Sequence, residues 1–86
     1  MEFEHDKNKS AINKQKHGIG FDEAQKLWDG RVVELQARDA GESRCLVVGR
    51  IGEVYWSAII TRRGGAIRII SVRRARDEER RTYEKG

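Results

Sequence analysis

Six arginines lie within residues 62–76, and this segment contains no acidic residue. Residues 1–61 carry nine lysines and arginines against ten acidic residues, and residues 77–86 carry three against four, so the excess charge is confined to this segment. A guanidinium group stays protonated, and its planar shape matches a phosphate group. The pattern favours binding to a nucleic acid, and the alternative is an ordinary hairpin whose arginines are solvated.

The chain also has the residue types needed to cut RNA without a metal, namely arginines, hydroxyl residues, and a histidine or glutamate. In that reaction the 2′-hydroxyl attacks its own phosphate, a base and an acid move protons, and cations stabilise the extra charge on phosphorus. The candidate catalytic residues are Thr61, Arg63, Arg68, Ser71, His17, Glu79 and Tyr83. The candidate nucleic-acid-binding residues are Arg62, Arg73, Arg74 and Arg76.

Each candidate has a structural alternative, which the sequence leaves open. Thr61 and Ser71 are of types that are common in strands. Arg68 stands between isoleucines and needs an open sheet face or an anionic partner, and Glu79 is one candidate for that partner. Tyr83 would then pack the last helix onto the sheet, and His17 would be a favourable charge at a helix C-terminus.

Other chemistries have weaker support in the sequence. His5 and His17 are expected on different elements, so we predict no metal site and no cofactor. Cys45 is the only cysteine, which excludes an internal disulfide, and its apolar neighbours predict a small core residue. The polar N-terminus does not resemble a signal peptide, and no apolar run approaches the roughly 20 residues of a membrane span. We therefore expect a cytoplasmic protein without membrane contact.

The elements that position these residues follow from the hydrophobic pattern, which predicts one α+β domain over residues 1–86. A short edge strand is expected over residues 1–5. A helix follows over Lys7–His17, with Asp6 as its N-cap, Gly18 as its C-cap, and apolar contacts from Ala11 and Ile12. A second helix is expected over residues 21–28, with its apolar side chains in the core.

The second half of the chain predicts four strands and a helix. The strands are expected over residues 31–37, 44–50, 54–61 and 66–72, with turns at "GES", "IGE" and "RRGG". A charged helix begins at Asp77. Because the turns are short, we expect a four-stranded antiparallel meander with the helices on one face.

The chain resembles the BrnT toxins of type II toxin–antitoxin modules over nearly its full length. The resemblance rests on "FEHDKNKSAINKQKHGIGFDEA", "GESR" and "TRRGGAIRIISVRRARDEERRTYE", and most of all on "KHGI" with the following "FDEA" and on the "IRIIS" block. The family pattern falls on Asp6, Lys9, Asn13, His17, Gly18, Phe21, Ala24, Glu42, Arg44, Thr61, Arg63, Arg68, Ser71, Arg73, Ala75, Glu79, Arg80 and Tyr83. The sequence departs from the pattern at His5 and Cys45, where aromatics are usual, and at Val72, where alanine is usual.

This resemblance implies a small fold similar to RelE-type ribonucleases, cleavage of RNA, and inhibition of growth. It also implies neutralisation by a BrnA-type antitoxin, with promoter DNA bound only through the toxin–antitoxin complex. We thus expect a metal-independent endoribonuclease toxin whose arginines form one cationic face. The first alternative is a non-catalytic RNA-binding module, although such modules usually expose aromatics and only Tyr55 is a candidate. The second alternative is a subunit that acts only by binding another protein.

Overall fold

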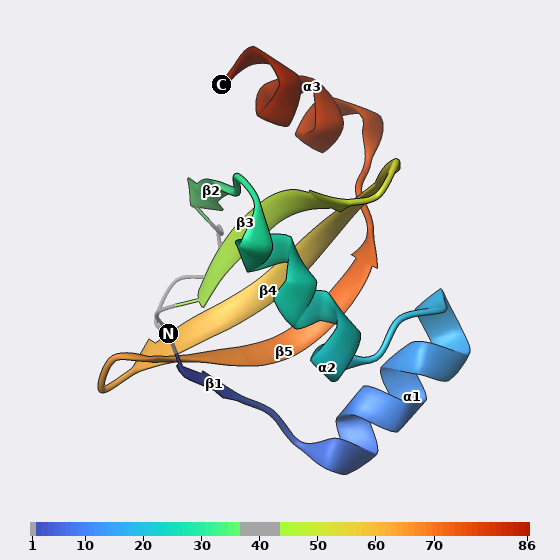
Figure 1. Ribbon diagram of the computed structural model, residues 1–86, viewed down its shortest axis with the longest axis vertical. Coiled ribbons are helices and arrows are strands. Elements are labelled where there is room, and N and C mark those ends of the chain that lie inside the picture. Colours follow the sequence, from blue (N-terminus) through green and yellow to red (C-terminus); the bar gives the residue numbers. More distant parts are fainter. Residues whose placement is uncertain (1, 37–43) are drawn as a thin grey trace.

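The computed structural model describes residues 2–36 and 44–86, and these residues form an α+β fold (Figure 1). The elements in chain order are β1 (Glu2–Glu4), α1 (Lys7–His17), α2 (Phe21–Ala24), the 3-10 helix η1 (Gln25–Asp29), β2 (Val33–Gln36), β3 (Arg44–Ile51), β4 (Val54–Arg63), β5 (Ala66–Arg74) and α3 (Asp77–Lys85). The predicted "GES" turn lies outside the described residues.

The described strands form one mixed sheet of five strands in the order β1-β5-β4-β3-β2. The pairs β2–β3, β3–β4 and β4–β5 are antiparallel, whereas β1 lies parallel to β5. The sheet therefore differs from the predicted four-stranded antiparallel meander. The difference arises because short turns determine only the pairing of consecutive strands. Strand β1 pairs with β5, from which three helical segments and three strands separate it in the chain.

Helix α1 begins and ends at the predicted residues. The Asp6 carboxylate accepts hydrogen bonds from the backbone N–H groups of Asn8 (2.8 Å) and Lys9 (3.2 Å), and Gly18 ends the helix with φ of 81°. The predicted apolar contacts from Ala11 and Ile12 are wrong, because both residues are exposed, Ile12 by 51%.

The buried residue of α1 is instead Asn13, which is only 6% exposed. Its side-chain amide donates to the carbonyl oxygens of Ile19 (2.8 Å) and Val72 (2.9 Å), and its oxygen accepts from the Val72 N–H (3.1 Å). Strand β1 pairs with β5 over Ala66 to Arg68. Farther along the same edge of β5, Asn13 forms hydrogen bonds with the backbone N–H and carbonyl groups of Val72. One amide thus replaces a strand partner and fixes α1 to the sheet.

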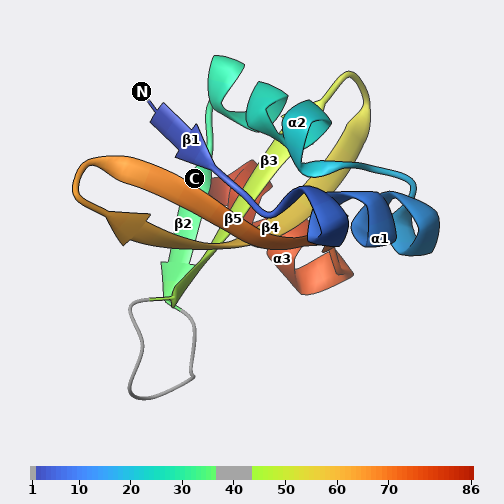
Figure 2. The same cartoon turned by 90° about the horizontal axis from the view of Figure 1, so that it is seen from below.

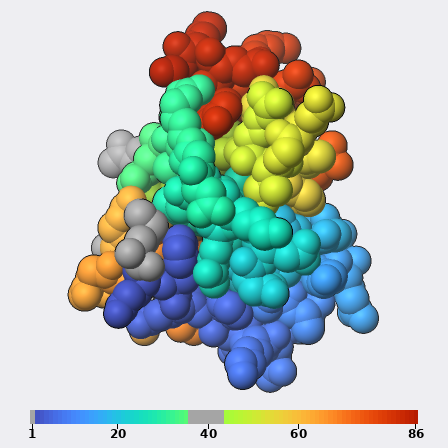
Figure 3. Space-filling view, in the orientation of Figure 1, coloured from blue at the N-terminus to red at the C-terminus, as the bar shows by residue number. Residues whose placement is uncertain are grey.

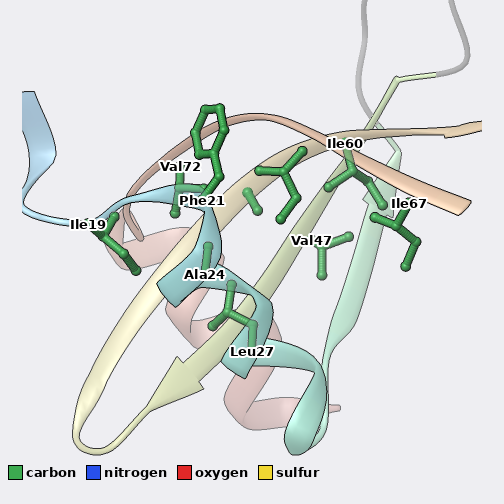
Figure 4. Close-up of a cluster of buried hydrophobic side chains, with 10 residues drawn as sticks. Ile19, Phe21, Ala24, Leu27, Val47, Ile60, Ile67 and Val72 are labelled. Carbon is green, nitrogen blue, oxygen red and sulfur yellow. The ribbon is translucent and has the colours of Figure 1, made fainter. Parts of the chain in front are cut away.

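The hydrophobic core lies between one face of the sheet and the segment α2–η1 (Figure 4). The predicted single helix over residues 21–28 is divided into an α-helical and a 3-10 part, and Phe21, Ala24 and Leu27 are buried as expected. Trp28 lies at the border of this core and contacts Phe3 of β1 edge-to-face, with ring centroids 5.2 Å apart. Figure 3 shows α1 and α2 covering this face of the molecule side by side.

Helix α3 lies on the opposite face of the sheet, so the prediction that all helices share one face is wrong (Figure 2). Side chains alternate along β4: Trp56 and Ala58 face the core, whereas Tyr55 and Ser57 face α3. The prediction left the face of β4 that carries Tyr55 and Ser57 partly open. Tyr55 and Ser57 provide contacts for α3, which has no buried residue of its own.

Candidate active site

A row of polar side chains crosses four adjacent strands on the face of the sheet that carries α3. Arg44 of β3 pairs with Thr61 of β4, Thr61 pairs with Arg68 of β5, and Arg68 pairs with Glu4 of β1. Residues directly opposite in neighbouring strands project from the same face, with strands about 4.8 Å apart. The row lies beyond the contacts of α3 with Tyr55 and Ser57, and its side chains are at least partly exposed.

Two more of the candidate catalytic residues flank this row. Arg63 follows Thr61 by two positions in β4, so it projects from the same face and is exposed. Ser71 of β5 pairs with Ile59 and is partly exposed. We use the term open face for Arg44, Thr61, Arg63, Arg68 and Ser71.

A bulge in β5 determines which residues reach the open face. Ile60 pairs with Ile69, but the preceding Ile59 pairs with Ser71, so Ile70 is an extra residue in the ladder. Strict alternation from Arg68 would have turned Ile70 and Val72 toward this face. The bulge instead turns Ser71 toward it and leaves Val72 in the core.

Arg68 has acidic neighbours from the N-terminal segment. One of its guanidinium nitrogens lies 3.9 Å from a carboxylate oxygen of Glu4, and the two side chains are 33% and 45% exposed. Nearby, backbone hydrogen bonds from Lys9 and Asn8 lower the pKa of Asp6, and the charges of Lys9 and Arg68 lower it further. Arg68 is therefore an accessible cation whose ion pair is long enough for a phosphate to displace.

The six arginines do not form one cationic face, which corrects that prediction. The Arg62 guanidinium donates to both carboxylate oxygens of Glu34 (3.0 and 2.9 Å) and approaches the sulfur of Cys45 at 3.8 Å, on the core side of the sheet. The hydrogen bonds to Arg62 lower the pKa of Glu34. Arg74 lies over the ring of Trp56, 5.6 Å from its centroid, also on the core side. Strand alternation therefore turns these two cations away from the open face.

Glu79 is held by Arg73 and not by Arg68. Both oxygens of its carboxylate accept from the Arg73 guanidinium at 2.8 Å, and one oxygen also accepts from the Ser57 hydroxyl (2.8 Å) and the Arg76 backbone N–H (2.8 Å). The hydrogen bonds from Arg73 are the main reason that the pKa of Glu79 falls to about 2. A carboxylate held ionised so strongly is a poor proton carrier near neutral pH.

Tyr83 and His17 lie away from the row. The Tyr83 hydroxyl donates to the carbonyl oxygen of Arg31 (3.2 Å), and its ring contacts Tyr55 with centroids 5.5 Å apart, so it packs α3 onto the sheet. His17 is the exposed last residue of α1, whose first turn lies near Arg68. An α-helix rises 1.5 Å per residue, which places His17 about 15 Å from that first turn.

The structure thus brings Thr61, Arg63, Arg68 and Ser71 to one face of the sheet. Glu79 lies on the same face but is bound to Arg73 and Ser57, whereas Tyr83 is bound to Arg31 and His17 ends α1. Reasoning from the sequence did not include Glu4 and Arg44 among the site residues. The register of β3 on β4 follows from the tight turn between them, so Arg44 was within reach of that reasoning. The pairing of Glu4 with Arg68 had no local signal, because it joins the first strand of the chain to the last.

Residues 2–36 and 44–86 contain no group of three or more His, Cys, Asp or Glu side chains arranged to hold a metal ion. The helices in this part of the chain are too short or too polar to span a membrane.

These features define a small α+β protein with an arginine- and hydroxyl-bearing surface on one sheet face. The family model for the ribonuclease toxin BrnT of type II toxin–antitoxin systems matches residues 5–79, and the chain therefore belongs to the BrnT family. This confirms the resemblance found in the sequence. Membership makes the protein a ribonuclease toxin at the level of the family and implies an antitoxin partner. No individually curated protein matches the chain significantly.

Proposed function

We propose that this chain is an endoribonuclease toxin that cuts RNA on the open face. The observation that carries the proposal is the pairing of Thr61 with Arg68 across β4 and β5, with Arg63 two residues farther along the same face. Two guanidinium groups and a hydroxyl next to each other provide a binding site for one phosphate and its bridging oxygens.

In this proposal Arg63 and Arg68 stabilise the charge that develops on phosphorus, while Thr61 and Ser71 position the phosphate by hydrogen bonds. Guanidinium groups on a rigid sheet are fixed before the reaction, so little reorganisation is needed as charge develops. Protein side chains thereby supply the positive charge, which supports a mechanism without a metal ion. Arg73 and Arg76 contribute mainly by holding Glu79 and α3.

The remaining parts of the proposal concern the cell. We propose that cleavage arrests growth in the cytoplasm, and that a BrnA-type antitoxin neutralises the toxin by covering the open face with acidic or apolar side chains. Promoter DNA would be bound only by the toxin–antitoxin complex, and the fold would be RelE-like. The charge of Arg63 and Arg68 and the half-buried Ile59 beside them support an acidic and apolar covering.

The test measures growth after induction and cleavage of RNA by purified protein in the presence of EDTA. The parent chain should arrest growth and cut RNA, and Arg68→Ala should lower the cleavage rate by about 100-fold or more. Arg81→Ala is the matched control, because Arg81 is an exposed arginine of α3. Binding of RNA without cleavage by the parent would support the non-catalytic module instead.

A further inference from the structure

The proposed cleavage requires a group that takes the proton of the attacking 2′-hydroxyl. Glu79 is saturated by hydrogen bonds, Tyr83 is engaged with Arg31, and His17 lies at the far end of α1. Among residues 2–36 and 44–86, the proton acceptor must therefore come from another element that borders the open face. Strand β1 is that element, since its residues pair directly with β5.

Glu4 is the carboxylate that β1 places beside Arg68. The two residues are register partners in the parallel pair, and their charged groups are 3.9 Å apart. The neighbouring Phe3 points to the opposite side, where it contacts Trp28, so alternation places Glu4 on the side of Thr61 and Arg68. Nearly half of the Glu4 side chain is exposed, so substrate can reach it.

We propose that Glu4 is the general base of the reaction, an inference that rests on the proposed function. The Glu4 carboxylate accepts the proton from the 2′-hydroxyl, and the 2′-oxygen forms a bond to the adjacent phosphorus. The bond from phosphorus to the 5′-oxygen breaks, and that oxygen takes a proton from water. The products are a 2′,3′-cyclic phosphate and a 5′-hydroxyl, and Glu4 returns its proton to the solvent.

The nearby Asp6 is less suited to this role. One of its carboxylate oxygens accepts two backbone hydrogen bonds at the start of α1, and protonation would weaken that cap. In the part of the chain that the structure describes, the polar partner of the Glu4 carboxylate is Arg68, at the long distance of 3.9 Å. The charged groups around Glu4 are Arg68 from β5 and, along its own segment, Glu2 and Asp6. Arg68 thus lies between the base and the phosphate-binding hydroxyl of Thr61.

The experiment compares Glu4→Gln with the parent in two assays. The first is single-turnover cleavage of an RNA oligonucleotide, and the second is binding of the same oligonucleotide with 2′-O-methyl groups, which cannot react. We expect Glu4→Gln to cleave about 100-fold more slowly or worse, because general bases contribute two or more orders of magnitude. We expect its binding to stay within about threefold or to tighten, because a negative charge is removed.

Glu2→Gln is the matched control, since Glu2 lies on the same strand and the same face but pairs with Ala66. It should cleave at the parent rate. The inference is overturned if Glu4→Gln cleaves at or above the parent rate, or if its binding falls in proportion to its cleavage, as a role limited to positioning Arg68 predicts. Failure of the parent to cleave RNA at all would overturn the proposed function, and this inference with it.

Discussion

Glu79 of α3 binds Arg73 of β5 through both of its carboxylate oxygens, each 2.8 Å from a guanidinium nitrogen. The pair is largely buried, with the two side chains 12% and 27% exposed, and the Ser57 hydroxyl completes it. No residue of α3 is buried, and this polar contact attaches the helix to the sheet together with the packing of Tyr83 on Tyr55. It keeps α3 at one end of the face and leaves the other end open.

Replacing Glu79 with glutamine should destabilise the protein. The substitution removes the charge and one strong acceptor, and leaves the Arg73 guanidinium partly buried without its anionic partner. We expect the free energy of unfolding to fall by about 2 kcal/mol. Urea denaturation measures the change. Glu84→Gln is the control on the same helix, with an expected change within about 0.5 kcal/mol because Glu84 is 48% exposed. Equal effects of the two substitutions would contradict this role of Glu79.

The ion pair of Glu79 with Arg73 should make the free energy of unfolding depend on pH. The pKa of Glu79 is about 2 in the folded chain against 4.5 for an ordinary glutamate, so folding favours the ionised form. Its stabilisation is therefore complete above about pH 4.5 and is lost as the pH falls toward about 2. We expect a loss of about 2 to 3 kcal/mol over this window from Glu79 alone. Urea denaturation at a series of pH values should show a shallower loss for Glu79→Gln, and parallel curves would refute the prediction.

Replacing Asn13 should destabilise the protein more than its position in a polar helix indicates. Alanine at this position would leave the Val72 N–H and the carbonyl oxygens of Val72 and Ile19 buried without the hydrogen bonds that Asn13 now provides. We expect Asn13→Ala to lower the free energy of unfolding by about 3 kcal/mol. The matched control is Asn8→Ala in the exposed first turn of α1, which should cost less than about 0.5 kcal/mol. A cost below about 1 kcal/mol for Asn13→Ala would show that the edge of β5 does not need this amide.

The hairpin that joins β4 to β5 requires its two glycines. Gly64 and Gly65 have φ of 52° and 89°, a region that other residues adopt only with strain. We expect Gly65→Ala to cost about 1 to 2 kcal/mol in thermal or urea denaturation. Gly30→Ala is the control, because Gly30 has φ of −119° and an added Cβ would meet nothing within 4 Å. If both substitutions cost the same, the turn conformation is not the cause.

Local sequence signals predicted the parts of the fold that depend on neighbouring residues. The caps Asp6 and Gly18 gave the bounds of α1, because each acts within one helical turn. The two-residue turn at Gly52 and Glu53 sets Ile51 opposite Val54, and counting back along both strands leads to the pairing of Arg44 with Thr61. This part of the row was therefore predictable.

The remaining parts depend on contacts between distant residues. Neither the parallel pairing of β1 with β5 nor the buried role of Asn13 has a periodic pattern in the sequence. The bulge at Ile70 reverses the alternation within an otherwise regular strand, so the orientation of Arg73 was not predictable from strand position. The ion pair of Arg62 with Glu34 likewise joins β4 to a strand two places away in the sheet.

The most direct test of the open face as the cleavage site uses two adjacent arginines of β4. Arg63 projects from the open face, whereas Arg62 is turned to the other side of the sheet and bound to Glu34. The measurement is the single-turnover rate of RNA cleavage by Arg63→Ala and by Arg62→Ala, each confirmed to be folded by its thermal transition. We expect a loss of about 100-fold for Arg63→Ala and of less than about threefold for Arg62→Ala. Equal losses, or a larger loss for Arg62→Ala, would contradict the placement of the reaction on this face.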